Sequence, residues 1–178
     1  MITGHVFIAT SLDGYIARPN GDIDWLQCVD TSNENHGYPE FMSKIDAIIM
    51  GRGTFETIRH FTPWPYKQPI IVLSSTLVDQ PIPEHLKGKV RFSSQTPKQV
   101  MNLLESEGCA RVYIDGGQVI QSFLVQDMIS DLIITQIPIL LGDGRPLFGH
   151  LPHDISVNHL KTQSFPSGFV QSHYEIVK

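Results

Sequence analysis

The sequence predicts an α/β fold built around a largely parallel β-sheet. Short apolar runs rich in β-branched residues recur along the chain, for example at residues 47–50 and 70–73. Helical patterns separate several of these runs, whereas the last two follow each other across a short turn. Neighbouring parallel strands need a connection long enough to hold a helix, so the alternation favours parallel pairing with an antiparallel carboxyl end.

The first predicted strand is the apolar segment at residues 6–9, which ends at Thr10 and Ser11. Asp13-Gly14 has the composition of a turn, and the short run at residues 15–17 leads into a second turn at Pro19-Asn20-Gly21. A strand followed by a loop is therefore expected here.

Further β-type runs predict strands at residues 47–50, 70–73, 90–92, 112–114 and 132–137. At the carboxyl end, two strand-like runs at residues 159–165 and 169–177 flank Pro166-Ser167-Gly168. That arrangement is typical of a hairpin, and it predicts the antiparallel edge.

Two helices are clearest in the second half of the chain. Thr96, Pro97 and Gln99 fit an N-cap, a first-turn proline and a reciprocal capping residue, and Gly108 suits the helix end. A second helix is predicted from about Gly117, with Val119, Ile120, Phe123 and Leu124 facing inward. Both helices would cover a face of the sheet.

Two glycine-containing junctions follow predicted strands and precede helices. They are Gly51-Arg52-Gly53-Thr54 and Asp115-Gly116-Gly117. In α/β sheets ligands bind beyond the carboxyl ends of the strands, where glycines allow the backbone to approach a phosphate and an arginine can bind its oxygens. The alternative is a pair of tight turns with a surface arginine. Neither junction matches G-x-G-x-x-G, so a standard Rossmann domain fits poorly.

Hydroxyl side chains end a third predicted strand, at Ser74-Ser75-Thr76. These hydroxyls and Arg52 could together bind the extra phosphate of NADPH. Helix capping or simple loop polarity is the alternative explanation for the triplet. The Trp64-Pro65-Tyr66 cluster is similarly open, since it can stack on a ligand ring or pack a loop onto the core.

Composition limits the class of protein. A chain of 178 residues suits one domain, residues 1–178, and its net charge of −5 without a basic stripe disfavours nucleic acid as a partner. No apolar run approaches the roughly 20 residues of a membrane span, and the amino terminus lacks the pattern of a secretory signal. With only two cysteines, a reducing, cytoplasmic location is expected, and no metal site is predicted.

Five segments, in this order and spacing, resemble the dihydrofolate reductase superfamily: GHVFIATSLDGYIA (4–17), IIMGRGTFETI (48–58), PIIVLSST (69–76), YIDGGQVIQSFL (113–124) and LIITQIPILLGDGRPLF (132–148). The SLDG and LGDG motifs at residues 11–14 and 141–144 are more similar to the branch of the bacterial riboflavin-biosynthesis reductase domain and its stand-alone relatives. The resemblance implies a three-layer fold with a central, mostly parallel eight-stranded sheet, an antiparallel carboxyl end and flanking helices. It also implies a homodimer, for which an exposed edge near residues 169–177 is a candidate surface.

The resemblance further implies NADPH as the cofactor and assigns its contacts to matched positions. These are Gly51, Arg52, Gly53 and Thr54 for the pyrophosphate and ribose, Ser74 and Ser75 for the 2′-phosphate, Gly116, Gly117, Gln118 and Val119 for the pyrophosphate and nicotinamide, and Ala9 and Ile16 for the nicotinamide. The segment 13–25 corresponds to a mobile loop that closes over the site.

Candidate proton donors are Asp13, Glu34 and Glu40, with ordered water as a further source. Asp13 can equally serve the Asp-Gly turn through its own side chain. Dihydrofolate reductases carry a carboxylate on the first helix, and here the corresponding segment has a different length and two candidate acids, Glu34 and Glu40.

Together these observations predict an NADPH-dependent oxidoreductase. It would transfer a hydride to a C=N or C=O bond of a small heterocyclic substrate, pterin-like or ribosylated pyrimidine-like. Two alternatives remain at this point: a genuine dihydrofolate reductase with an atypical acid, and a non-catalytic module that binds NADPH.

Overall fold

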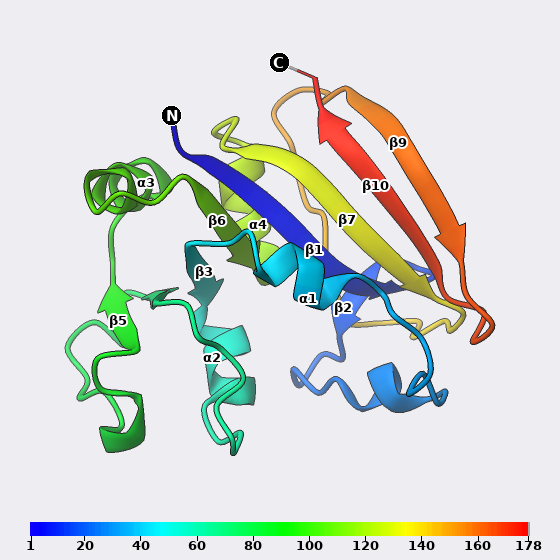
Figure 1. Ribbon diagram of the computed structural model, residues 1–178, viewed down its shortest axis with the longest axis horizontal. Helices are drawn as coiled ribbons and strands as arrows, with labels where there is room; N and C mark the ends of the chain where they lie inside the picture. Colours follow the sequence, from blue (N-terminus) through cyan, green and yellow to red (C-terminus); the bar gives the residue numbers. More distant parts are fainter. Residues whose placement is uncertain (178) are drawn as a thin grey trace.

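The structure, a computed structural model, describes residues 1–177 and is dominated by one eight-stranded sheet (Figure 1). Its strand order is β5-β4-β3-β6-β1-β7-β10-β9. The strands are β1 (Thr3–Ser11), β3 (Ala47–Gly51), β4 (Ile70–Leu73), β5 (Val90–Ser93), β6 (Arg111–Asp115), β7 (Ile129–Ile137), β9 (Val157–Ser164) and β10 (Val170–Ile176). Every strand predicted from the apolar runs is present.

Pairing in the sheet is parallel from β5 through β7. β1 pairs in parallel with both β6 and β7, and β3 pairs in parallel with β4 and β6. β10 then runs antiparallel to β7 and to β9, which confirms the carboxyl-terminal hairpin (Figure 1). The predicted fold class is confirmed.

One detail of that hairpin was predicted wrongly. The segment near residues 169–177 is not a sheet edge, because β10 lies between β7 and β9 and leaves β9 at the edge. In this order every residue of β9, whose sequence VNHLKTQS is largely polar, is exposed, whereas β10 ends at the buried Ile176. The more polar strand occupies the more solvated position.

Helices cover both faces of the sheet and complete the three layers. α1 (Tyr38–Met42) and α2 (Arg52–Ile58) pack on one face with a core that includes Phe41 and Phe55. α3 (Pro97–Ser106) and α4 (Gly117–Leu124) pack on the other face with Leu104 and Phe123. In Figure 1, α1 crosses in front of the sheet and α4 lies behind it.

The capping signals placed α3 correctly. The Thr96 hydroxyl accepts the N–H of Gln99 at 3.4 Å, and the Gln99 side chain accepts the N–H of Thr96 at 3.0 Å. The helix ends at Ser106, and Gly108 has a φ of +90°, in the left-handed region that glycine tolerates.

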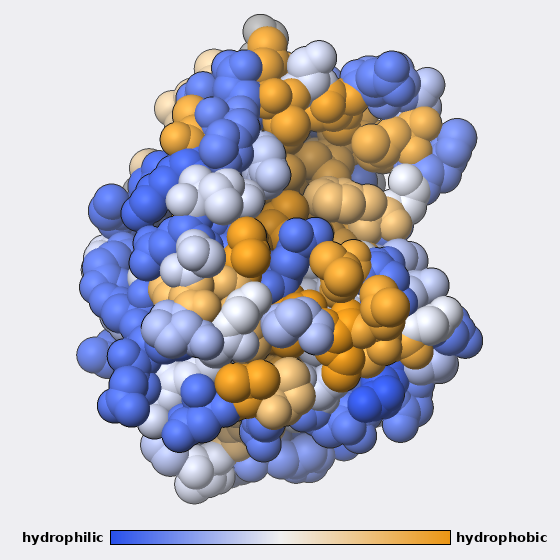
Figure 2. All heavy atoms as spheres, turned by 90° about the vertical axis from the view of Figure 1, so that its right-hand side faces the viewer, coloured by the Kyte–Doolittle hydropathy of each residue, from blue (hydrophilic) through white to orange (hydrophobic). Residues whose placement is uncertain are grey.

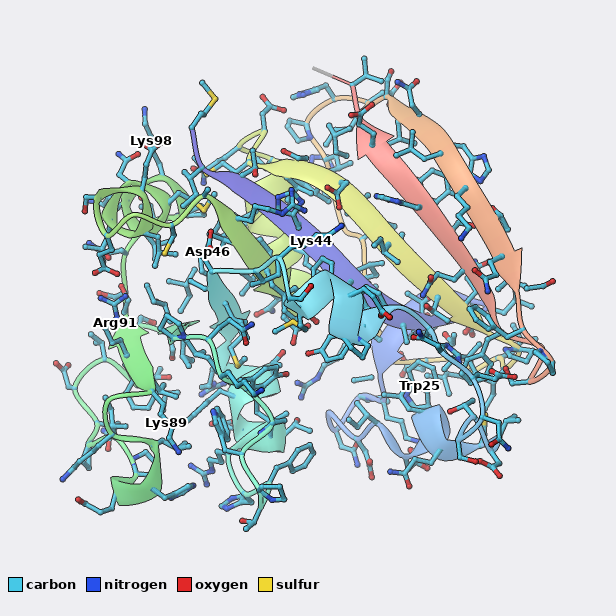
Figure 3. The ribbon with its side chains drawn as sticks, viewed as in Figure 1. Trp25, Lys44, Asp46, Lys89, Arg91 and Lys98 are labelled. Carbon is cyan, nitrogen blue, oxygen red and sulfur yellow. The ribbon has the colours of Figure 1, made fainter. Side chains whose placement is uncertain are left out.

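A small second sheet was not predicted. Within the segment 13–25, β2 (Tyr15–Ala17) pairs antiparallel with β8 (Arg145–Pro146). The paired residues Ala17 and Arg145 are 128 residues apart in the sequence (145 − 17). A 3₁₀ turn, η1 (Asp24–Gln27), follows and buries Trp25 to 2% exposure beside Ile137 and Phe169 (Figure 3). The short turn η2 (Glu84–Leu86) precedes β5. The predicted loop is thus anchored at both of its ends.

An apolar groove of about 570 Å³ opens on the α4 side of the sheet, over its β7 and β10 strands. Figure 2 shows hydrophobic residues lining this hollow beside a polar strip. Its wall includes Leu132 and Ile134 of β7, Tyr174 and Ile176 of β10, and Phe148 from the loop after β8.

None of the helices within residues 1–177 combines the length and the apolar character that crossing a bilayer requires.

The core of the α3–α4 face should carry much of the stability. Phe123 has no exposed surface, so Phe123→Ala is expected to lower the free energy of unfolding by about 3–5 kcal/mol in urea titrations. Leu160 on β9 is 53% exposed and provides the control, since Leu160→Ala is expected to change stability by less than about 0.5 kcal/mol. Equal losses for the two variants would contradict this assignment of the core.

Candidate active site

The carboxyl ends of the parallel strands meet at one edge of the sheet. Gly51, the last residue of β3, pairs with Leu73, the last of β4, and Met50 pairs with Asp115, the last of β6. The strand ends before Arg52, Ser74 and Gly116 are therefore neighbours, as the sequence motifs predicted. This adjacency comes directly from the parallel register.

The two glycine turns touch each other. A Cβ atom added to Gly116 would lie 2.7 Å from the hydroxyl oxygen of Thr54 and 3.8 Å from the amide nitrogen of Gly51. Gly116 also has a φ of +91°, which side chains of L-amino acids rarely adopt. Only glycine therefore allows the turn after β6 to pack this closely on the turn after β3.

Arg52 extends over the turn that follows β4. Its Nη1 atom lies 3.5 Å from the hydroxyl of Thr76, which is 3.0 Å from the hydroxyl of Ser74. Glu56 is the nearest carboxylate, at 4.0 Å from Nε of Arg52. Ser75 and Gln118 are exposed. A guanidinium and several hydroxyls are thus gathered at one end of the site.

At the other end, Ile16 approaches Gly117. A Cβ on Gly117 would lie 3.1 Å from Cδ1 of Ile16 and 2.6 Å from the carbonyl oxygen of Pro146. A Cβ on Gly51 would likewise lie 3.1 Å from a methyl group of Val119. The glycines at both turns permit close contacts that a larger residue would block.

Ala9 lies where β1 separates from β6. The ladder between these strands ends at His5 and Tyr113, whereas β1 continues to pair with β7 as far as Ser11. Beyond that point the hydroxyl of Tyr113 donates to the carbonyl of Phe7 at 2.9 Å. Backbone groups of β1 near Ala9 therefore face β6 without a ladder partner there.

Asp115 is a titratable residue that the sequence analysis did not single out. Burial raises its pKa to about 6, although the Gly116 N–H and the nearby Tyr113 side chain act in the opposite direction. In the sequence, the aspartate of Asp115-Gly116-Gly117 has the composition of a turn residue. Its place at the last position of a buried strand was the signal that could have identified it.

Three tyrosines surround this carboxyl group. Burial and the nearby Asp115 raise the pKa of Tyr38 to about 12, and they raise the pKa values of Tyr66 and Tyr113 as well. All three phenols are therefore protonated at neutral pH and can donate hydrogen bonds. Near its end, β6 thus combines a weak acid with phenolic donors.

The Trp64-Pro65-Tyr66 segment packs onto the core. Both aromatic rings contact the α1–α2 cluster and each other, with ring centroids 5.7 Å apart. The Trp64 indole N–H is buried and has no hydrogen-bond partner within residues 1–177. The packing alternative is the one that the structure supports.

The carboxylate of Asp13 holds two loops together. It accepts N–H groups from Leu141 at 3.2 Å and Gly142 at 2.8 Å, and the hydroxyl of Ser11 donates to it at 2.6 Å. The Ser11 bond, with those N–H groups, holds the pKa of Asp13 below its ordinary value. Asp13 is therefore ionised at neutral pH and ties its own loop to the loop at residues 141–142, whereas the local turn is closed by the backbone bond from the Gly14 N–H to the Ser11 carbonyl. The catalytic role predicted for Asp13 stays a prediction.

Glu34 and Glu40 have structural hydrogen-bond partners. Glu34 accepts the N–H and the hydroxyl of Ser167, both at 2.7 Å, and it lies 3.0 Å from the ring of His36. Burial raises the pKa of Glu34, but these bonds outweigh it and lower the pKa overall. Glu40 accepts from Asn35 at 3.0 Å, which lowers its pKa. The catalytic role predicted for these carboxylates has no test in the structure and stays a prediction.

A family model described as the RibD C-terminal domain matches residues 3–171.

The chain belongs to the RibD C-terminal domain family.

Two similar proteins align with nearly the whole chain. The Bacillus subtilis (strain 168) protein YwjB is 34% identical over 171 residues, 95% of each chain. A crystal structure titled as a putative riboflavin biosynthesis protein from Shewanella sp. PV-4 superimposes with a TM-score of 0.92 and 38% identity, covering 99% of this chain and 100% of that one.

A more distant structure shares the fold. It is titled as a diaminohydroxyphosphoribosylaminopyrimidine deaminase/5-amino-6-(5-phosphoribosylamino)uracil reductase from Thermotoga maritima, with a TM-score of 0.77 and 15% identity. The match covers 99% of this RibD C-terminal domain and 57% of the larger protein.

The raised pKa of Asp115 predicts a pH-dependent cost to stability. Between about pH 4, the ordinary value, and pH 6 the folded protein binds the proton more tightly than the unfolded chain, so stability falls as pH rises through this window. Asp115→Asn removes the titrating group and with it this pH-dependent loss of stability. Relative to wild type, its free energy of unfolding should rise by about 1–3 kcal/mol between pH 4 and pH 8.

Asp46 is a control of opposite sign. Its carboxylate accepts the N–H groups of Ala110 and Arg111 at 2.8 and 2.9 Å, which lowers its pKa (Figure 3). Asp46→Asn should therefore lose stability relative to wild type as pH rises. Urea titrations at several pH values measure both variants, and parallel trends would contradict the environment assigned to Asp115.

Proposed function

We propose that the protein is an NADPH-dependent oxidoreductase that transfers a hydride to a C=N or C=O bond of a small heterocyclic substrate, pterin-like or ribosylated pyrimidine-like. Family membership points to an oxidoreductase. The observation that carries the proposal is the contact between the two glycine turns at Gly116 and Thr54, at the carboxyl edge of the sheet.

The residues at this edge fit a dinucleotide. The first N–H groups of α4 have no partner inside the helix, and the adjoining Gly117 has no side chain to cover them. Arg52 and the hydroxyls of Ser74 and Thr76 would take the 2′-phosphate. The nicotinamide end would lie against Ala9, Ile16 and Gly117.

NADPH would supply the hydride when bound. The chain's part is to hold donor and acceptor close together, to exclude water and to handle the proton. Segment 13–25 is suited to excluding water, because the β2–β8 pair and Trp25 anchor it beside the site. Loop closure over bound ligand remains part of the proposal.

For proton delivery we propose Asp115 as a candidate beside Asp13, Glu34 and Glu40, whose predicted role stays part of the proposal. With a pKa of about 6, Asp115 keeps a proton in an appreciable fraction of molecules near neutral pH, whereas the other three carboxyl groups have lowered pKa values. Tyr38 and Tyr66 would donate hydrogen bonds to acceptor atoms of a heterocycle and orient it.

Calorimetric titration with NADPH tests the proposal at its first step. Wild-type protein is expected to bind NADPH, and Arg52→Met is expected to weaken that binding by about tenfold or more, because a charge-assisted hydrogen bond to phosphate is lost. The same substitution should change NADH binding much less, since NADH lacks the 2′-phosphate. If the wild-type protein does not bind NADPH at millimolar concentrations of the cofactor, the proposed function is wrong.

We also propose that the protein is a homodimer in which the apolar groove meets a second copy. Phe148 lines this groove and remains 46% exposed. A second copy would remove this surface from water.

Light scattering coupled to size exclusion tests the dimer. Wild type should have the mass of two chains, and Phe148→Asp should shift it towards one chain, because a carboxylate would be buried without a partner. Phe61→Asp is the matched control, since Phe61 is also 46% exposed and does not line the groove. A monomeric wild type, or equal effects of the two substitutions, would contradict this interface.

A further inference from the structure

Arg145 reaches the candidate cofactor edge from β8. A Cβ built on Gly53 would lie 2.9 Å from Nη1 of Arg145, and one built on Gly21 would lie 3.0 Å from its Nη2. The guanidinium therefore lies between the turn after β3 and the loop that contains β2. It fills space that side chains at these two glycines would otherwise occupy.

The backbone of Arg145 is held in place by its neighbours. Arg145 pairs with Ala17 of β2, and the next residue, Pro146, accepts a hydrogen bond from Nε2 of Gln121 on α4 at 3.3 Å. The carbonyl of Pro146 also packs on Gly117. One two-residue strand thus contacts both glycine turns, through its main chain at Gly117 and through its guanidinium at Gly53.

Arg145 carries a positive charge without a carboxylate beside it. Arg18 and Arg91 pair with Asp24 and Glu107 at 2.6 Å, whereas the guanidinium of Arg145 makes no salt bridge or hydrogen bond within residues 1–177. Arg52 adds a second guanidinium on the same turn. The two cations create a local excess of positive charge on a protein whose net charge is −5.

We propose that Arg145 binds the pyrophosphate of the dinucleotide, an inference that rests on the proposed function. A guanidinium can bind phosphate oxygens with two parallel hydrogen bonds, which suits a fixed position between the two turns. Arg52 extends instead towards Ser74 and Thr76 at the edge of the site, where the 2′-phosphate is placed. The two arginines therefore recognise different phosphates of one ligand.

Measuring the affinity for both NADPH and NADH distinguishes the roles of the two arginines. Arg145→Met keeps an apolar stem and removes the charge, so calorimetry should show binding of both cofactors weakened by the same factor, about tenfold or more. Arg145→Lys restores a point charge without the planar fork and should recover part of the loss. Arg59→Met is the matched control, since Arg59 caps the opposite end of α2 and should change both affinities less than about twofold.

Each result bears on a separate claim. Wild type that binds NADPH, together with an Arg145→Met protein of unchanged affinity and native circular dichroism, would overturn the role of Arg145 and leave the proposed function standing. A loss confined to NADPH would overturn the pyrophosphate assignment. A wild type that binds neither cofactor removes both proposals. If Arg145→Met folds poorly, Arg145→Lys provides the test instead. Lysine lacks the planar guanidinium, so unchanged affinity of this variant for both cofactors would contradict bidentate binding.

Discussion

The close contact of Gly116 with Thr54 is the constraint on which the candidate site depends. It joins the turn after β6 to the turn after β3, and it is possible only because Gly116 lacks a side chain and adopts a positive φ. Parallel pairing brings these turns to one edge, and glycine allows them to touch. Arg52, Asp115 and the first turn of α4 all adjoin this contact in the sequence.

Carboxyl groups around the site differ in pKa because their surroundings differ. Asp13 and Glu34 receive several hydrogen bonds, which favour the charged form, whereas burial dominates at Asp115 and favours the neutral form. The first two tie loops together, so their charge serves structure. Asp115 lies near phenols at the end of a central strand, and burial raises its pKa.

The sequence was informative wherever structure depends on local pattern. Apolar runs located the strands of the main sheet, the Thr96 to Gln99 capping box located α3, and the glycines located the turns. Contacts between distant segments left no local pattern. The pairing of Ala17 with Arg145, the bonds from Ser167 to Glu34 and the tyrosines around Asp115 depend on side chains that only the folded chain brings together. The order of β9 and β10 was missed for the same reason.

The two halves of the sheet differ in how firmly they are held. β6 and β1 lie in the middle of the sheet, and β6 ends in a cluster of buried aromatic groups, whereas β9 is fully exposed and has a neighbour on one side only. Local opening requires less free energy where few apolar contacts must break. Amide protons of β9 should therefore exchange with solvent through fraying, while those of the central strands β6 and β1 wait for global unfolding. The strand β6, which ends at the candidate site, thus lies in the slowly exchanging part of the sheet.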